Sequence, residues 1–338
     1  ISGSGYSIIQ DEGISLTSRS TVTFVGTGVT VTDTGSKTQV SIPSGGAAAY
    51  YGVKAEDYIT SGDGSASNPY NASAIQNAIN ALPARGGIVF IKEGVWRGTS
   101  RITGPTSGNK KVILQGAGAE YSIYVEDQIG TLVQAGFDFY QPTDLYDMSI
   151  SPHPNNFGIQ PGAKYIWDPN KMSTVFRWLG GFTVERVRFT DCDPGLWLTG
   201  ENVAAGSNMQ MWLVKVNQCA FVSGKRGLKI DYGDSPDPTN VRFVLSQLTN
   251  LLVQHNGAGR AVEVNLAGAD SSGVWGPWIV ELNSSAADTY AIYVDTFASA
   301  GLFINGIETG DGNASVKDAF FNIGRGARVT HFNHRKDV

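Results

Sequence analysis

The segment LWLTGENVAAGSNMQMWLVKVNQCAFVSGKRGLKI, residues 196–230, carries the pattern that decides the fold. It begins and ends with an apolar–x–apolar motif, LWL at 196–198 and LKI at 228–230. The motif returns as VEV at 262–264 and IYV at 292–294, so the steps between motifs are 32, 34 and 30 residues. A strand motif with a period of about 20–50 residues is typical of a β-solenoid or a propeller. Propeller blades need about 40–45 residues, so the shorter step favours a solenoid of stacked coils.

A second set of residues repeats with the same period. Asn217, Asn250 and Asn283 follow one another at steps of 33 residues. Two patterns that share a period indicate that successive coils stack with equivalent residues in register. We therefore predict regular coils over residues 180–310, in which the first and third residues of each strand motif face the core.

Composition supports a β-rich protein and excludes several classes. Of 338 residues, 42 are glycine, 41% are hydrophobic and 16% are charged, which is enough apolar material for a core and excludes a disordered chain. Glycine lacks the period of three found in collagen. No apolar run approaches the about 20 residues of a membrane helix, and no signal-peptide pattern opens the chain. We expect no membrane insertion.

Charge and cysteine content exclude further classes of function. The chain has 25 Lys and Arg against 30 Asp and Glu, a net charge of −5, whereas a nucleic-acid partner requires a basic face. Cys192 and Cys219 lack zinc-site spacing and are too few for a disulfide scaffold, so buried free thiols are expected, with a bridge between neighbouring coils as the alternative. The four histidines show no ligand spacing, and we expect no metal or cofactor.

The N-terminal region differs from the rest of the chain. Residues 1–45 are rich in Ser, Thr, Gly and Val, and residues 29–42 alternate apolar and polar side chains around Gly35-Ser36. That alternation predicts a β-hairpin with one buried face. A segment this short lacks a core of its own, so we assign 1–45 as an N-terminal β or connector segment and 46–338 as the main domain.

One helix is predicted, at about residues 73–82. Ser73 and Gln76 have the spacing of a capping box, and Pro83 ends the helix. Its apolar residues fall on one stripe and must cover another surface: Ile75, Ala78, Ile79 and Leu82.

An aromatic-rich segment interrupts the repeat at about residues 137–178. A long insertion within a solenoid is either functional or packed against a neighbour. We predict that it forms the wall of a binding groove or a contact between subunits.

The helix and the strands after it, ASAIQNAINALPARGGIVFIKEGVWRGTSRITGPTSGNKKVILQGAGAE at residues 72–120, resemble the entry to the pectate-lyase-like, single-stranded right-handed β-helix family. In that family such a helix caps the open end of the solenoid. A Gly-Gly strand (here from Gly86), a turn ahead of a bulky aromatic (Trp96) and a V-x-L-x-G-x-G coil (112–118) follow. The resemblance implies an all-β right-handed parallel β-helix over 46–338. The family's calcium-binding Asp cluster and Gly-His-Gly motif do not occur here.

Residues 13–42 are similar to segments ahead of the β-helix in bacteriophage tail fibres and tailspikes. This resemblance implies a homotrimer in the virion tail or the extracellular space that recognises a host by binding a bacterial surface polysaccharide. It favours a depolymerase, either a glycoside hydrolase or a polysaccharide lyase. The alternatives are a non-catalytic glycan-binding adhesin or structural fibre protein, and a secreted polysaccharide lyase.

The middle residues of the strand motifs are expected to face solvent in one column, because side chains alternate along a strand and coils stack about 4.8 Å apart. That column reads Trp197, Lys229, Glu263 and Tyr293, and the next outward column reads Thr199, Asp231, Asn265 and Asp295. Aromatic faces beside polar and charged groups suit a carbohydrate groove. The alternative is a solvated face on which Lys229 and Glu263 form an ordinary cross-strand ion pair.

If the protein is an enzyme, we expect Glu263 and Asp231 to be its acid and base, with Asp295 in reserve. Carboxyl pairs about 5–9.5 Å apart serve glycosidases, and neighbouring coils give a separation in this range. The predicted substrate-binding residues are Trp197 and Tyr293, which would stack on sugars, Lys229, which would hold a uronate or sialic carboxylate, and Asn265.

Overall fold

The computed structural model describes residues 10–11, 14–15, 30–33, 38–41, 52–105, 110–126, 136–151, 161–168, 181–201, 209–224, 226–231, 241–244, 246–255, 260–265, 268–270, 272–282, 290–294, 302–311, 321–323 and 328–334. The chain divides into two compact units, residues 1–49 and 50–338. The first contains two antiparallel pairs: β1 (Gln10–Asp11) with β2 (Ile14–Ser15), and β3 (Thr30–Asp33) with β4 (Thr38–Ser41). In the second pair Val31 lies opposite Val40, which confirms the hairpin predicted at 29–42.

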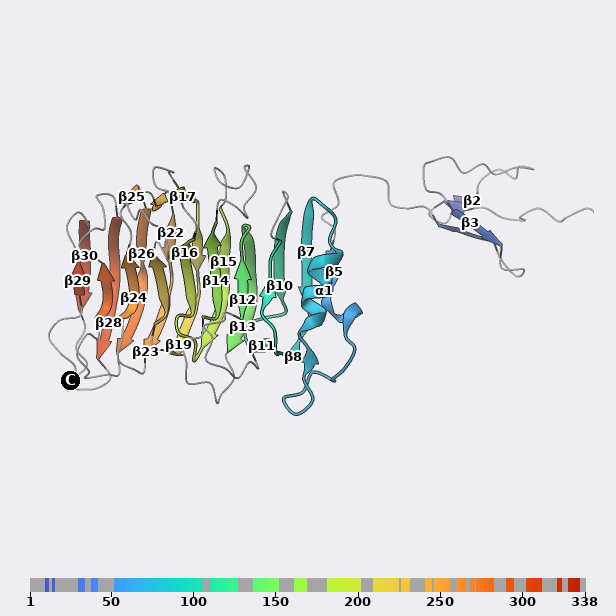
Figure 1. Cartoon of the computed structure of the whole chain (residues 1–338), viewed down its shortest axis with the longest axis horizontal. Helices are drawn as coiled ribbons and strands as arrows, with labels where there is room; N and C mark the ends of the chain where they lie inside the picture. Colours follow the sequence, from blue (N-terminus) through green and yellow to red (C-terminus); the bar gives the residue numbers. More distant parts are fainter. Residues whose placement is uncertain are drawn as a thin grey trace, which may run out of the picture. The chain divides into compact units, whose positions relative to one another are not determined.

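The second unit is mostly β, with parallel strands in curled sheets and little helix (Figure 1). Its first sheet has fifteen strands: β5 (Gly52–Lys54), β6 (Tyr70–Asn71), β7 (Gly86–Ile91), β8 (Gly94–Gly98), β10 (Lys111–Gly116), β11 (Ser122–Glu126), β13 (Thr143–Ser151), β15 (Thr183–Thr190), β18 (Lys215–Asn217), β19 (Ala220–Gly224), β22 (Gln247–Thr249), β23 (Leu252–His255), β26 (Ser272–Leu282), β28 (Leu302–Asp311) and β30 (Arg328–His334).

The second sheet is built from eight strands that follow one another in chain order: β9 (Ile102–Thr103), β12 (Phe137–Phe139), β14 (Ala163–Trp167), β16 (Leu196–Gly200), β20 (Leu228–Asp231), β24 (Arg260–Asn265), β27 (Tyr290–Val294) and β29 (Phe321–Ile323). A third sheet has three strands: β17 (Met209–Trp212), β21 (Val241–Val244) and β25 (Gly268–Asp270). Each strand pairs in parallel with one from the next coil, which is the arrangement expected of a parallel β-helix.

The register of the second sheet confirms the repeat found in the sequence. Leu196 pairs with Leu228, Leu228 with Val262, and Val262 with Ile292. Leu196, Leu228 and Val262 are all fully buried, so the motif places its first residue in the core. Each buried aliphatic side chain of this kind stabilises the fold by about 1.5–3 kcal/mol.

The regular coils begin well before residue 180. Phe137 of β12 pairs with Ala163 of β14, and Ala163 pairs with Leu196. The prediction of an insertion at 137–178 is therefore wrong for the described part of this segment. FDF at 137–139 and AKY at 163–165 have the same apolar–x–apolar alternation as the later motifs, but with aromatic residues or alanine at the inward positions.

The aromatic side chains of these coils fill the interior. The rings of Tyr165 and Phe182 stack 3.8 Å apart with an interplanar angle of 5°, and Phe139 contacts Tyr165 at 5.0 Å. Phe137 lies 4.6 Å from Tyr124. All five are buried. Phe137, Phe139 and Tyr165, which were predicted to form a groove wall, thus form core, where ring pairs add about 0.5–1.5 kcal/mol beyond their area. Tyr140 and Tyr146 of the same segment are half-buried.

The asparagine repeat is offset by one residue from the prediction. Asn217 pairs with Thr249, so Asn250 lies opposite Gln218, although the Asn250 side chain still donates to Asn217 Oδ1 at 2.8 Å. Asn283 lies outside the described residues. Gln218 and Asn250 both have φ of 52°, and they continue a left-handed column that begins with two residues of the preceding coils, Asp147 and Arg186.

Replacing Gln218 with glycine is expected to raise the free energy of unfolding by about 1 kcal/mol. Its side chain is exposed, and a left-handed conformation costs a non-glycine residue about 1–2 kcal/mol. Urea denaturation followed by circular dichroism measures the change. The control is Gln247→Gly at an exposed position within β22, where glycine weakens a strand. A Gln218→Gly variant no more stable than the parent would contradict the backbone argument.

The predicted helix is α1 (Ser73–Ala81), and its buried stripe comprises Ala74, Ile75, Ala78 and Ile79. It contacts β5, β7, β9 and the short 3-10 helix η1 (Ala55–Tyr58) at one end of the coil stack (Figure 1). The predicted capping box is wrong. The N-cap residue is Ala72, which makes no side-chain cap, and Gln76 Oε1 instead accepts a hydrogen bond from the Thr103 N–H at 2.7 Å.

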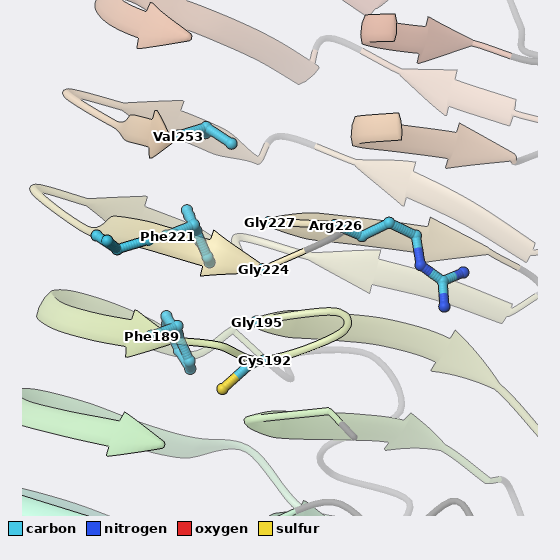
Figure 2. A pocket seen from close by; sticks show the side chains of 9 residues that line it. Phe189, Cys192, Gly195, Phe221, Gly224, Arg226, Gly227 and Val253 are labelled. Carbon is cyan, nitrogen blue, oxygen red and sulfur yellow. The ribbon is translucent and has the colours of Figure 1, made fainter. Parts of the chain in front are cut away.

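Cys192 and Cys219 are buried free thiols. Burial raises the pKa of Cys219 to about 12 and raises that of Cys192 further, so both thiols stay protonated at neutral pH. Cys192 lies beside the tight corner drawn in Figure 2, together with Gly195 and the rings of Phe189 and Phe221. This corner leaves no room for a water molecule, so it is packed core and not a ligand site.

Candidate functional site

One column of side chains runs along the outer side of the second sheet. It comprises the middle residues of successive strands, each paired in register with the next, and we call it the outer ladder: Asp138, Lys164, Trp197, Lys229 and Glu263, with Tyr293 at the next register position. The four residues placed in one column from the sequence do lie in register. The ladder extends two coils further toward the N-terminus, through Lys164 and Asp138.

Trp197 lies at the centre of the ladder between two lysines. Lys164 Nζ lies over the indole at 4.7 Å from the ring centroid, and Lys229 Nζ lies over it at 4.5 Å. The two lysines come from the coils on either side of Trp197. Sugar stacking on Trp197 stays a prediction, and in the structure without ligand the indole contacts both ammonium groups. Trp197 holds two ammonium groups by cation–π contact, each worth about 0.5–2 kcal/mol.

Asp231 fixes this arrangement from the neighbouring outward position. Its Oδ1 accepts a hydrogen bond from Trp197 Nε1 at 3.0 Å, and its Oδ2 lies 2.7 Å from Lys229 Nζ. The Lys229 ammonium is thus held by an indole face and a carboxylate. Two of the residues that the sequence assigned to different roles, Lys229 and Asp231, form one ion pair.

The predicted carboxylates are more buried than a solvated face allows. Asp231 is 7% exposed and Glu263 is 9% exposed. Arg226 accompanies Glu263, with Nη1 3.9 Å from Glu263 Oε2, and its Nε donates to Asp193 Oδ1 at 2.7 Å. Charged groups are buried only when they are paired, so this part of the surface is a network of ion pairs.

The N-terminal half of the ladder was missed from the sequence. Lys164 Nζ lies 2.7 Å from Glu201 Oε1, with both side chains about one-fifth exposed. Asp138 is almost fully buried and accepts a hydrogen bond from Arg101. Burial raises the pKa of Asp138, and the positive charges of Arg101 and Lys164 oppose that rise. The FDF and AKY motifs could have predicted these positions. Asp138 and Lys164 are the middle residues of the two motifs, and the residues on both sides of each face inward.

The structure places the other predicted residues as follows. Asn265 pairs with Asp231 in register, and Tyr293 pairs with Glu263. Thr199 follows Leu198 in β16 and is buried, with no hydrogen-bond partner for its hydroxyl among the described residues. Asp295 lies outside the described residues. The chain therefore brings Trp197, Lys229 and Asp231 into contact, with Glu263 on the next coil.

Two further observations bear on the kind of site. In the described parts of the chain, no three His, Cys, Asp or Glu side chains are grouped so as to hold a metal ion. None of the helices described there is long and apolar enough to cross a membrane.

Comparisons with known proteins complete the description. No protein-family model and no curated protein sequence matches the chain. Among solved structures, ORF18 of Geobacillus virus E2 is similar at 16% identity and a TM-score of 0.44, over 85% of this chain and 61% of the viral protein. The A-module of the Azotobacter vinelandii mannuronan C-5 epimerase AlgE4 gives 14% identity and a TM-score of 0.31, over 82% and 99%.

The Streptococcus pneumoniae surface protein and adhesin PfbA is similar at 12% identity and a TM-score of 0.35, over 85% of this chain and 97% of the adhesin. This chain thus spans less than two thirds of the viral protein and nearly the whole length of the other two.

Proposed function

We propose that the chain is a right-handed parallel β-helix protein of a bacteriophage tail fibre or tailspike, assembled as a homotrimer, that binds a bacterial surface polysaccharide along the outer ladder. The observation that carries the proposal is the pair of lysines held on Trp197 with carboxylates beside them. The resemblance of residues 13–42 supplies the tail-fibre assignment, and that of residues 72–120 supplies the β-helix.

The ladder suits a linear polyanion for three physical reasons. The ammonium groups of Lys164 and Lys229 are fixed in position by Trp197, so little side-chain entropy is lost when they bind a carboxylate or hydroxyl. The lysine side chains are also 18–19% exposed, so neither is fully enclosed by the protein. Lys164 and Lys229 lie two coils apart, about 9–10 Å at the usual spacing of stacked strands, so they match a ligand whose acidic groups repeat at about that distance along the same axis. Trp197 acts as a positioning residue.

Cleavage of the bound polysaccharide is a second candidate function. Glu263 and Asp231 lie on adjacent coils, and that separation suits a pair of glycosidase carboxyl groups. Asp231 accepts hydrogen bonds through both oxygens, from Trp197 and Lys229, so we assign proton transfer to Glu263 and charge stabilisation to Asp231. Asp295 stays in reserve, and Tyr293 and Asn265 remain the proposed sugar contacts beside them.

The Glu263→Gln variant is expected to bind polysaccharide like the parent and to release no product. An amide of the same shape keeps the packing beside Arg226 but donates no proton to a leaving oxygen. The measurement is incubation with a panel of purified capsular polysaccharides and lipopolysaccharides, followed by reducing-end and ultraviolet assays. New reducing ends alone indicate hydrolysis, and absorbance of an unsaturated uronate indicates a lyase.

Three outcomes separate the candidates. Product release by the parent but not by Glu263→Gln supports catalysis at this residue. Binding without product from either protein supports the adhesin and removes the enzyme. Binding of none of the panel contradicts the proposed function itself.

A further inference from the structure

A second recess lies outside the ladder, at the end of the coil stack that carries α1. It is an open cleft of about 440 Å³ between the start of α1, β6 and the segment that joins β8 to β9. Two arginines, Arg97 and Arg101, line it together with hydroxyl and amide side chains, including Asn71, Ser73 and Asn77. No acidic residue lines the cleft, although the chain as a whole has a net charge of −5.

Arg97 gives the cleft an unsatisfied donor. Its Nε is buried and has no hydrogen-bond partner, and among the described residues no carboxylate pairs with its guanidinium. A buried polar group without a partner destabilises the fold, and more so when the group is charged. Guanidinium groups bind carboxylate and phosphate oxygens in a bidentate manner.

The start of α1 adds a second, independent source of positive potential. Its N-cap residue, Ala72, makes no side-chain cap, and the first turn contains no acidic residue. Ser73, Gln76 and Asn77 of the first two turns line the cleft, so the start of the helix lies beside it. Unpaired N–H groups and the helix dipole both favour an anion at this end of a helix.

The cleft is joined to the outer ladder by one contact. Arg101 lines the cleft and donates a hydrogen bond to Asp138, which is the N-terminal member of the ladder. An anion bound by Arg97 and Arg101 would therefore lie beside the end of the proposed saccharide surface. A chain that carries acidic groups could occupy both.

We propose that this cleft binds the oxyanion of an acidic saccharide, a carboxylate or a phosphate, through Arg97, Arg101 and the N–H groups at the start of α1. The identity of the ligand as a saccharide rests on the proposed function, whereas the anion site rests on the cleft alone. The site sets specificity: it selects acidic polysaccharides over neutral ones.

The test is calorimetric titration of the whole chain with sodium glucuronate, glycerol phosphate and glucose. Glucuronate or glycerol phosphate is expected to bind and glucose is not, and the stronger of the two anions identifies the ligand as uronate or phosphate. Arg97→Gln is expected to weaken that binding by about tenfold, the loss of one charge-assisted hydrogen bond. Arg188→Gln, at an exposed arginine of β15, is the matched control and should bind like the parent.

The outcomes distinguish this inference from the proposed function. Anions that bind no better than glucose, or an Arg97→Gln variant that is folded by circular dichroism and binds like the parent, would overturn the anion site. Polysaccharide binding that persists in that case leaves the ladder proposal standing. Anion binding that depends on Arg97, in a chain that binds no polysaccharide of the panel, supports the anion site and contradicts the ladder proposal.

Discussion

Valine in place of Gly195 is expected to lower the free energy of unfolding by about 3 kcal/mol or more. A Cβ atom at this position would lie 2.5 Å from Phe221 Cδ1, 2.9 Å from the Gly227 carbonyl oxygen and 3.0 Å from Phe189 Cβ. Figure 2 shows the corner between these residues. The two rings are stacked at 5.1 Å with an interplanar angle of 6°, so neither can move away without breaking the pair.

Backbone contacts make the same position intolerant of a shift. The Gly195 N–H donates to the Arg226 carbonyl, and the Leu196 N–H donates to the Gly227 carbonyl, both across adjacent coils. A displaced Gly195 would therefore disturb the register of β16 with β20, which aligns Trp197 with Lys229 in the outer ladder. Overpacked cores respond by strain or rearrangement, and we therefore expect a large decrease in the free energy of unfolding.

Urea denaturation followed by circular dichroism measures the effect. The matched control is Arg188→Val, which inserts the same side chain at an exposed position of β15 and should stay within about 0.5 kcal/mol of the parent. A Gly195→Val variant as stable as Arg188→Val would show that the corner is looser than the distances indicate.

Loss of both ladder lysines, in Lys164→Ala with Lys229→Ala, is expected to weaken polysaccharide binding by about a hundredfold. Each ammonium supplies one charge-assisted hydrogen bond of about 1.5 kcal/mol, and about 1.4 kcal/mol corresponds to a factor of ten in affinity. Surface plasmon resonance with the polysaccharide that binds best measures the loss, and rising salt should weaken the parent more than the variant.

The matched control lies on the other sheet. Lys215 of β18 is 48% exposed and pairs with Glu185 at 3.3 Å, so Lys215→Ala removes a lysine of similar chemistry from the first sheet. It should bind like the parent. If Lys215→Ala loses as much affinity as the double variant, the protein attracts the polysaccharide through its overall charge, and the ladder lysines are not a specific binding site. A folded double variant with unchanged affinity would also contradict the ladder.

The stacking of coils was predictable from the sequence because it depends on alternation alone. The apolar–x–apolar motifs fix which side chains face inward, and their spacing fixes which residues meet, as in the pairing of Leu196 with Leu228. The earlier coils escaped prediction because their inward residues are aromatic, as in Phe137 and Tyr165, and an aliphatic search pattern does not recognise them. The buried face of a strand depends on polarity and not on side-chain shape.

The candidate site was predictable only in part. Alternation placed Trp197, Lys229 and Glu263 in one outward column, but it contains no information on which neighbours each side chain contacts. The lysines that cover the indole, and Arg226 beside Glu263, belong to other coils or to the preceding turn. The cleft was not predictable, because α1 and Arg97 meet there only after the chain has folded.

The most direct test of the outer ladder is a crystal structure of the chain with an oligosaccharide cut from the polysaccharide that binds best. We expect sugar hydroxyl or carboxylate oxygens within hydrogen-bond distance of Lys164 Nζ or Lys229 Nζ, on the outer side of strands β14, β16 and β20. Oligosaccharide density over the first sheet alone, with the lysines still closed on Trp197 and untouched by ligand, would contradict it.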